Sequence, residues 1–307
     1  VMNLRRPVFQ NPKVREALTL LLDFEWTNKQ LFNGSYSRTK SYFDNSEMAS
    51  SGLPSANELK ILEPLRGKIP EQVFNEEFKL PVSDGSGMIR PQLRRAFQLL
   101  QEAGWTVKND KMSDAQGNPM KLEFLLAQTQ FERILLPYKR NLNDLGIELT
   151  IRRVDTAEYV NRLRSRDYDM IVSSFPQSSS PGNEQREYFH SVSADRTGSR
   201  NFMGLKDPAV DSLVDGLINA NSRQDLVDHA RALDRVLLWG FYVLPNWHIK
   251  TWRVAYWDHI GHPGVKALSD IGLSSWWYKP DAHPAPPVQQ AQQPDSTPGS
   301  LPASAEQ

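Results

Sequence analysis

Apolar residues recur at helical spacing in several stretches of the chain, and some of these stretches carry a recognisable start or stop signal. Asn11 followed by Pro12 is typical of a helix N-terminus, and Asp207 followed by Pro208 repeats the signal. Gly146 stands where a helix commonly ends. The pattern predicts helices over residues 12–22, 24–32, 57–65, 91–103, 131–145, 156–164, 208–218 and 225–239.

Short apolar runs alternate with these helices between residues 122 and 175. The runs 122–127, 147–154 and 169–174 are typical of strands, so the order is β-α-β-α-β. This order predicts an α/β fold with a mostly parallel sheet, helices on both faces, and all strand carboxyl ends at one edge. Because the run 170–172 is apolar without alternation, we expect its strand to be central.

Two further segments have strand character. Residues 105–120 are expected to form a hairpin that turns at 114–117. Residues 241–257 are aromatic and prone to form strands, although Pro245 interrupts them.

The segment 175–186, which follows the third predicted strand, is crowded with Ser, Pro, Gly, Asn and Gln. Open α/β sheets place their ligands at loops that follow the carboxyl ends of strands. The segment is therefore the first candidate for a binding site, although a solvated surface loop explains its composition equally well.

Composition excludes several classes of function. The chain of 307 residues has 36 basic and 36 acidic residues, so its net charge gives no reason to expect nucleic acid or an anionic membrane as a partner. It has no cysteine, which excludes disulfides, thiolate catalysis and Cys-ligated zinc. His259 and His262, near Asp258, match no common metal spacing, and no G-x-S-x-G elbow occurs. We expect no catalytic residue, metal or cofactor.

The two ends of the chain suggest a piece of a larger protein. The start has no signal-peptide pattern and leads directly into a helix cap, so we expect the chain to be the carboxyl part of a longer protein. Residues 1–278 are expected to form the folded part. The Pro-, Gln- and Ser-rich residues 279–307 are expected to be disordered.

Several strings resemble the family 5 extracellular solute-binding proteins, which are the peptide receptors of ABC importers. They are NPKVREALTLLLDFEW, LLQEAGW, DYDMIVSSF and GLKDPAVDSLVDGLINA. Within the family, SSSPGNEQREYF and VLPNWHIKTWRVAYWD are most similar to the Yej-type periplasmic binding proteins. The resemblance covers about residues 3–278.

The resemblance implies the carboxyl-terminal lobe of a two-lobed, class C periplasmic binding protein. Its cleft would close on a peptide-like solute: an oligopeptide, a microcin C-like compound or a murein peptide. The partner would be an ABC permease and ATPase in the inner membrane, and the receptor a periplasmic monomer whose signal peptide lies on the missing amino-terminal part. Residues from about 250 to 278 would return toward the missing lobe.

The resemblance also implies site residues. Phe175 lies where many relatives have an aromatic residue beside the ligand, and Ser178 lies where peptide receptors commonly have the aspartate that binds the α-amine. Because serine cannot neutralise an ammonium, either Glu184 takes this role or the missing lobe holds the amine. Trp247 and His248 lie in the aromatic strand that lines the cleft in relatives.

Other residues of the region have two interpretations each. Arg186 could pair with Glu184 to bind the termini of a peptide, or the two could be a solvated surface pair. Ser179 and Asn183 are expected to contact ligand, although serine-rich loops are often only loops. Asn201 could bind a ligand backbone or stabilise a turn. Trp247 could pack on the ligand or belong to the core.

Two alternative functions remain open on the sequence. One is a periplasmic α/β enzyme that acts on peptides, against which no nucleophile–base pair, phosphate loop or metal motif can be assembled. The other is a peptide sensor or chaperone that takes no part in transport.

Overall fold

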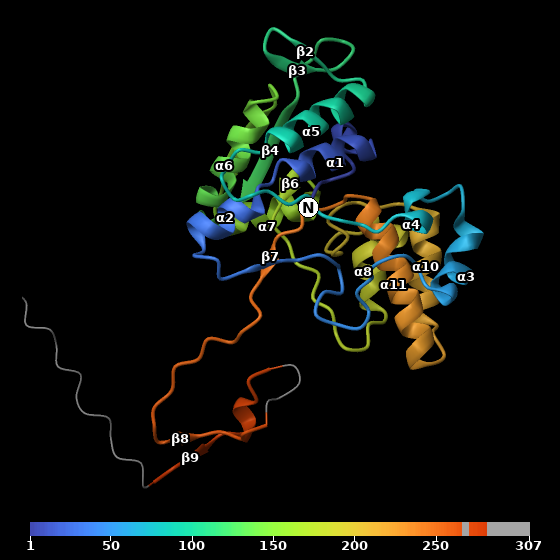
Figure 1. Cartoon of the computed structure of the whole chain (residues 1–307). Helices are drawn as coiled ribbons and strands as arrows, with labels where there is room; N and C mark the ends of the chain where they lie inside the picture. Colours follow the sequence, from blue (N-terminus) through green and yellow to red (C-terminus); the bar gives the residue numbers. More distant parts are fainter. Residues whose placement is uncertain (266–269, 281–307) are drawn as a thin grey trace, which may run out of the picture. The chain divides into compact units, whose positions relative to one another are not determined.

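The computed structural model describes residues 1–265 and 270–280. The chain divides into two compact units, Val1–Ile249 and Lys250–Gln307, which are treated separately below. The parallel sheet belongs to the first unit (Figure 1). Of the tail expected to be disordered, residues 281–307 lie outside the described residues.

The sheet of the first unit has parallel strands in the order β5-β4-β6. They are β4 (Lys121–Leu126), β5 (Glu148–Arg153) and β6 (Met170–Ile171). The crossovers between them contain α6 (Glu132–Asn143) and α7 (Thr156–Ser165). The predicted β-α-β-α-β series and its parallel pairing are confirmed.

The place of β6 in the sheet differs from the prediction. The middle strand is β4, and β6 pairs with it along one edge only. The other edge of β6 is covered by the start of the chain, where Met2 forms an antiparallel bridge with Met170. Met170 and Ile171 are therefore buried. The unalternating apolar run indicated burial correctly, but the order of the strands incorrectly.

Helices cover both faces of the sheet, as predicted. Successive side chains of a strand point to opposite faces. Phe124 of β4 belongs to a core shared with α1 (Pro12–Leu20), α5 (Arg90–Glu102) and α6. The next residue, Leu125, belongs to a second core, against which Tyr159 of α7 packs.

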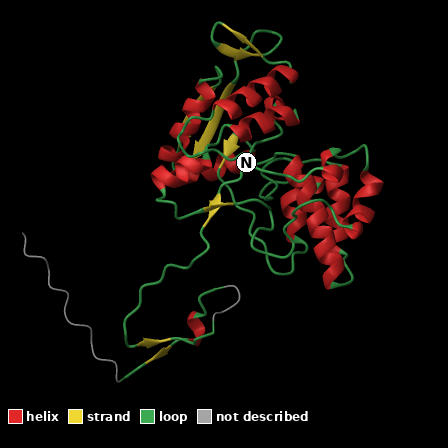
Figure 2. Cartoon of the chain, viewed as in Figure 1, coloured by secondary structure: helices red, strands yellow, loops and turns green. Residues whose placement is uncertain are grey.

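The second core is centred on α11 (Arg223–Trp239), which is buried along most of its length. The helices around it, seen as the group of red ribbons away from the sheet in Figure 2, are α3 (Ala56–Leu62), α4 (Gln72–Asn75), α8 (Glu184–Phe189) and α10 (Pro208–Ile218). The other helices of the described residues are α2 (Phe24–Leu31), α9 (Ser191–Ala194), η1 (Pro7–Phe9), η2 (Glu63–Leu65), η3 (Thr129–Phe131) and η4 (Leu273–Ser275). Among the α-helices that the structure describes, only α4, α8 and α9, none longer than 6 residues, lack a predicted counterpart.

The hairpin exists, but it turns earlier than predicted. It consists of β2 (Thr106–Lys108) and β3 (Lys111–Ser113) in antiparallel pairing. Its turn is Asn109–Asp110, whose φ angles are +50° and +60°. Two successive positive φ angles are typical of the type I′ turn that two-residue hairpins favour. The segment 114–117 forms a second turn, in which Asp114 N–H donates to the Asn118 carbonyl (3.0 Å).

Two short strands join segments that are far apart in the chain. β1 (Ser37–Arg38) pairs antiparallel with β7 (Trp247–His248). Strand β7 is the one strand in the aromatic segment 241–257. Just beyond β1, Thr39 N–H donates to the Asn246 carbonyl at 3.0 Å. This pairing places Trp247 against the α/β part of the first unit.

The second unit is described over residues 250–265 and 270–280. There β8 (Ile260–Gly261) pairs antiparallel with β9 (Trp277–Tyr278), and the ring of Tyr256 lies 5.0 Å from that of Trp276. Trp252 is 70% exposed. The unit therefore leaves large aromatic side chains uncovered by its own described residues.

Among the residues described, no helix combines the length and the apolar character that a membrane crossing requires.

Candidate functional site

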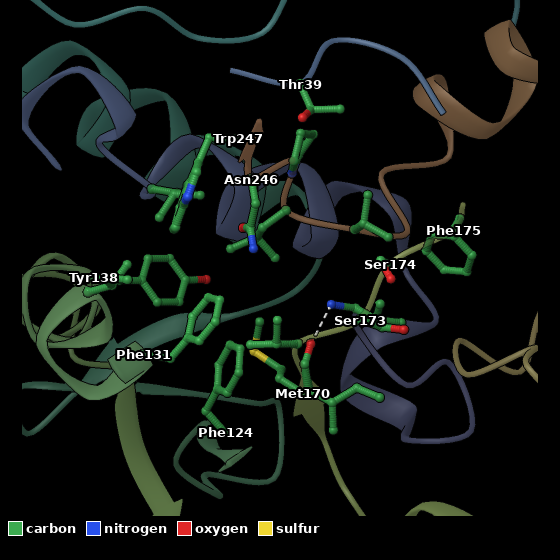
Figure 3. A pocket seen from close by; sticks show the side chains of 18 of the residues that line it. Thr39, Phe124, Phe131, Tyr138, Met170, Ser173, Ser174, Phe175, Asn246 and Trp247 are labelled. Carbon is green, nitrogen blue, oxygen red and sulfur yellow. Dashed lines mark hydrogen bonds between the residues drawn. The ribbon is translucent and has the colours of Figure 1, made fainter. Parts of the chain in front are cut away.

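A pocket of about 250 Å³ lies where β4 and β6 end, entirely within the first unit (Figure 3). Most of its wall comes from four parts of the chain: β4 with η3 and α6, β6 with its continuation as far as Phe175, the segment 39–42 after β1, and the segment 243–247 that leads into β7. Val1, Leu22 and Leu238 complete it. Carboxyl ends of parallel strands are the usual ligand-binding edge of such sheets. The structure therefore places the pocket where the topology predicted a site.

Aromatic rings form one side of the pocket. Phe124, Phe131, Tyr138 and Trp247 lie together in Figure 3, opposite Ser173, Ser174 and Phe175. The rings of Trp247 and Phe131 are stacked, with centroids 6.2 Å apart and planes inclined by 25°. Behind them, Trp247 also contacts the rings of Phe24 and Phe32 at 6.3 and 4.9 Å. Packing on both sides restricts the Trp247 ring to one orientation.

The hydroxyl of Tyr138 already has a partner. It donates to the main-chain carbonyl of Leu18 at 3.2 Å, and burial raises the pKa of this phenol. The ring of Tyr138 therefore presents an apolar surface to the pocket.

Small polar groups complete the pocket lining. Ser173 and Ser174 follow Val172 in the continuation of β6, and Thr39 and Asn246 come from the paired segments beside β1 and β7. No residue in the pocket lining of the described chain is Asp, Glu, Lys, Arg or His. Because an isolated charge is costly in an apolar site, the pocket suits an uncharged group.

A buried carboxylate on α11 holds the segment that supplies part of the pocket wall. Asp234 is inaccessible to solvent and accepts hydrogen bonds from Ser41 Oγ (2.8 Å), Tyr42 N–H (2.8 Å), Ser50 N–H (3.0 Å) and Ser50 Oγ (2.6 Å). Burial raises its pKa to about 6 in spite of these four donors. The segment 41–50 is thereby fixed to α11.

The structure brings two of the predicted site residues together. Phe175 and Trp247 both line the pocket. Phe175 packs on Tyr42, Tyr188 and Phe189, with centroid separations of 5.8, 5.7 and 5.4 Å. Both aromatic residues therefore serve the core and the pocket at once.

The structure does not support the prediction that Asn201 binds ligand. It is completely buried, its side-chain nitrogen donates to the carbonyls of His190 and Leu205, and its oxygen accepts from Leu205 N–H. All of these bonds stabilise its own turn, which was the alternative interpretation.

The other predicted residues do not line the pocket. His248 Nδ1 lies 3.2 Å from Thr39 Oγ1, on the β1–β7 pair. Arg186 pairs with Asp215 (2.5 Å), not with Glu184. The predicted charged pair of Glu184 and Arg186 is therefore absent.

The loop residues lie apart from the pocket as well. Ser178, Ser179 and Asn183 are exposed. Glu184 begins α8, and its Oε1 accepts from Gly182 N–H at 2.9 Å. These residues stay candidates only for contacts outside the pocket.

Sequence reasoning missed most of the pocket lining. Ser173 and Ser174 could have been found, because they end the predicted strand 169–174 and the carboxyl ends of parallel strands are the usual binding edge. Phe131 also has a signal, since it lies between a strand end and the next helix. Tyr138 and Phe124 look like ordinary core residues in the pattern, and Thr39 and Asn246 meet only through the β1–β7 pair.

In the second unit, His262 Nε2 lies 2.9 Å from the Tyr256 hydroxyl. The described residues contain no group of His, Cys, Asp and Glu arranged to hold a metal ion.

Comparison with known proteins identifies relatives that match most of the chain. Residues 1–196 match the family described as bacterial extracellular solute-binding proteins, family 5 Middle. The "Probable peptide-binding protein YejA" of Agrobacterium fabrum is 43% identical over 279 residues, which are 90% of this chain and 45% of that protein. The "Peptidoglycan-binding protein YepA" of the same organism is 39% identical over 278 residues, again 90% of this chain and 45% of the relative. The chain spans about half the length of the curated relatives it matches.

A solved structure supports the same assignment at the level of fold. The oligopeptide-binding protein AppA from Bacillus subtilis, solved in complex with a nonapeptide, superposes with a TM-score of 0.62 at 18% identity, covering 90% of this chain and 49% of AppA. The predicted fold class, a lobe of a periplasmic binding protein, is confirmed. With the family match over residues 1–196, the resemblance seen in the sequence is confirmed too. The chain belongs to the bacterial extracellular solute-binding proteins, family 5.

Proposed function

We propose that this chain forms one wall of the ligand cleft of a periplasmic peptide receptor that delivers its ligand to an ABC permease. The observation that carries the proposal is the uncharged aromatic pocket at the strand carboxyl ends, flanked by the continuation of β6. Relatives named for peptide and peptidoglycan binding support this choice of ligand class. The second wall would come from the half of the protein that the relatives have beyond this chain.

The pocket has the features that capture of an extended peptide requires. Residues 172–176 leave β6 without entering a helix or strand, and they run along the pocket as far as Phe175. A peptide can pair its main chain with such a segment while its side chains enter pockets beside it. Affinity would then depend little on the sequence of the peptide, and selectivity would depend on the pockets.

Binding without chemistry explains the pocket better than catalysis does. Its described lining has hydroxyls from Ser and Thr, but no His or Lys to activate one as a nucleophile. Ser41 donates a hydrogen bond to Asp234 on α11, but this carboxylate is inaccessible to solvent and accepts three other hydrogen bonds. We therefore propose a receptor that releases its ligand unchanged, and we expect it to act as a monomer.

Calorimetry on the full-length protein tests the proposal. Short peptides should bind, and mass spectrometry after incubation should recover them intact. Cleaved or modified peptide would support the enzyme alternative, and the absence of binding to any peptide would contradict the receptor.

Deletion of the cognate permease genes tests the role in transport. It should abolish peptide uptake, and unchanged uptake would favour a sensor or chaperone.

The isolated chain should bind peptide much more weakly than the full-length protein. Closure of two lobes supplies contacts that one wall cannot make. Calorimetry with the same peptide on residues 1–278 and on the full-length protein measures the difference. Equal affinities would show that this wall suffices.

The role of Glu184 as the group that binds the α-amine of the ligand is a prediction. Its Oε1 is occupied locally, and the described residues provide no hydrogen bond to its Oε2. A charge-assisted hydrogen bond contributes about 1.5–3 kcal/mol, so Glu184→Gln in the full-length protein should weaken binding of a free peptide by roughly 10-fold or more. The same peptide after N-acetylation should lose much less.

Two results would argue against this role for Glu184. Equal losses for free and acetylated peptide would make it structural, through its bond to Gly182 at the start of α8. No loss for either peptide would place the amine on the other lobe.

A further inference from the structure

We propose that the pocket is a side-chain subsite that selects an aromatic residue of the bound peptide. The inference rests on the proposed peptide-binding function and specifies its ligand. It starts from the absence of charged residues in the described pocket lining and from the rings of its aromatic side, those of Phe124, Phe131, Tyr138 and Trp247.

The volume of the pocket fits one large side chain. An apolar cavity of about 150 Å³ in another protein holds a benzene molecule, and this pocket has about 250 Å³. A pocket for a whole drug-sized ligand has about 300–1,000 Å³. The space therefore accepts the ring of Phe, Tyr or Trp but not several side chains together.

The chemistry of the wall favours a ring over an aliphatic or charged group. Phe131 and Trp247 offer ring faces and edges to a guest ring, which gains from offset or edge-to-face contact. A lysine or glutamate side chain would lose its hydration in the pocket without gaining a charged partner.

The wall is organised before a ligand arrives. Trp247 is held between Phe131 and Phe24, and the Tyr138 hydroxyl is fixed to Leu18. Met170 is fully buried in β6. A guest ring therefore meets surfaces that need little ordering, which favours affinity.

The polar side of the pocket orients the guest. Ser173 and Ser174 lie across from the rings, where they can bond the amides on either side of the inserted residue, and Asn246 lies beside Trp247. A ring in the aromatic side leaves its own main chain beside these polar groups, whereas the reverse orientation would bury amides against rings. The geometry thus selects the side chain, and not the backbone, for the deep part of the pocket.

The test uses the full-length protein and tripeptides. Ala-Ala-Ala is the reference, and single substitutions place Phe, Leu or Lys at each of the three positions. At one position, Phe should bind about 10- to 100-fold more tightly than Ala, because burying a large apolar side chain contributes that much. At that position Leu should bind less tightly than Phe, and Lys should gain nothing over Ala.

A matched pair of variants locates the effect in this pocket. Phe131→Ala should reduce the advantage of Phe over Ala by about 2- to 10-fold, since it removes one ring contact. Phe97→Ala is the control: Phe97 is also half-buried and packs against the same core, but it does not line the pocket. The control should leave the advantage unchanged.

The outcomes separate this inference from the proposed function. Binding of all tripeptides with no preference for Phe, or a preference for Leu or Lys, would overturn the aromatic subsite and leave the receptor standing. Equal effects of the two variants would also overturn it. Failure of every tripeptide to bind would overturn the receptor proposal and the subsite with it.

Discussion

Replacing Glu58 by alanine should lower the free energy of unfolding by about 3–5 kcal/mol, the usual cost of breaking a buried ion pair from one side. Glu58 and Arg235 are 3% and 5% exposed at their side chains, and Glu58 Oε2 lies 2.5 Å from Arg235 Nε. Arg235 also donates to the carbonyls of Ser51, Gly52 and Leu53. Without Glu58, a guanidinium stays in the interior without its counter-charge.

A neighbouring exposed pair provides the control. Glu63 and Arg66 form an ion pair at 2.8 Å on η2, with side chains about half exposed. Glu63→Ala should change the stability little, because water replaces the lost partner. Urea unfolding of the full-length protein measures both variants. Similar midpoints for the two would mean that the buried pair contributes no more than the exposed one.

The second large effect is a dependence of stability on pH through Asp234. Its pKa is about 6 in the folded chain and 3.8 in the reference state, since burial penalises the charged carboxylate. The folded state therefore binds this proton more tightly. The resulting stabilisation is complete below pH 3.8 and is lost as the pH rises through 6, which amounts to about 3 kcal/mol at 1.36 kcal/mol per pKa unit.

Comparison with Asp234→Asn isolates this contribution. The variant has no titrating group at this site. Wild type should lose about 2 kcal/mol relative to it between pH 4 and pH 7, because the carboxyl of the unfolded chain, with a pKa of 3.8, is already largely ionised at pH 4. Unfolding curves at several pH values give the difference, and other titrating groups cancel. A difference that stays constant, or that changes in favour of wild type as the pH rises, would contradict the raised pKa.

The local elements of the fold could be predicted because their signals are local. Asn11 accepts a hydrogen bond from Lys13 N–H, and Asp207 accepts one from Ala209 N–H, so both predicted caps are real. The long helices could be predicted from their amphipathic spacing, which is also a local signal. The short α8 lacked enough turns to show a periodicity.

The strand order and most of the pocket could not be predicted, because they depend on contacts between distant residues. Met170 would be buried whether its strand lay between two strands of the sheet or, as here, between β4 and the start of the chain. Its burial therefore does not reveal the strand order. The place of Glu184 in the loop made it a candidate, but helix α8 begins there and uses its Oε1 locally. Phe175 and Trp247, which do line the pocket, were indicated by the resemblance to the family and not by the residue pattern.

The pairing of β1 with β7 has a consequence for synthesis of the chain. Thr39 meets Asn246 only after the ribosome has added the intervening residues, which takes roughly 10 to 40 s at about 5–20 residues per second. Until then the rings of Phe24 and Phe32 lack the cover of Trp247. The nascent chain therefore exposes aromatic surface during this interval, and that surface is the kind that chaperones bind.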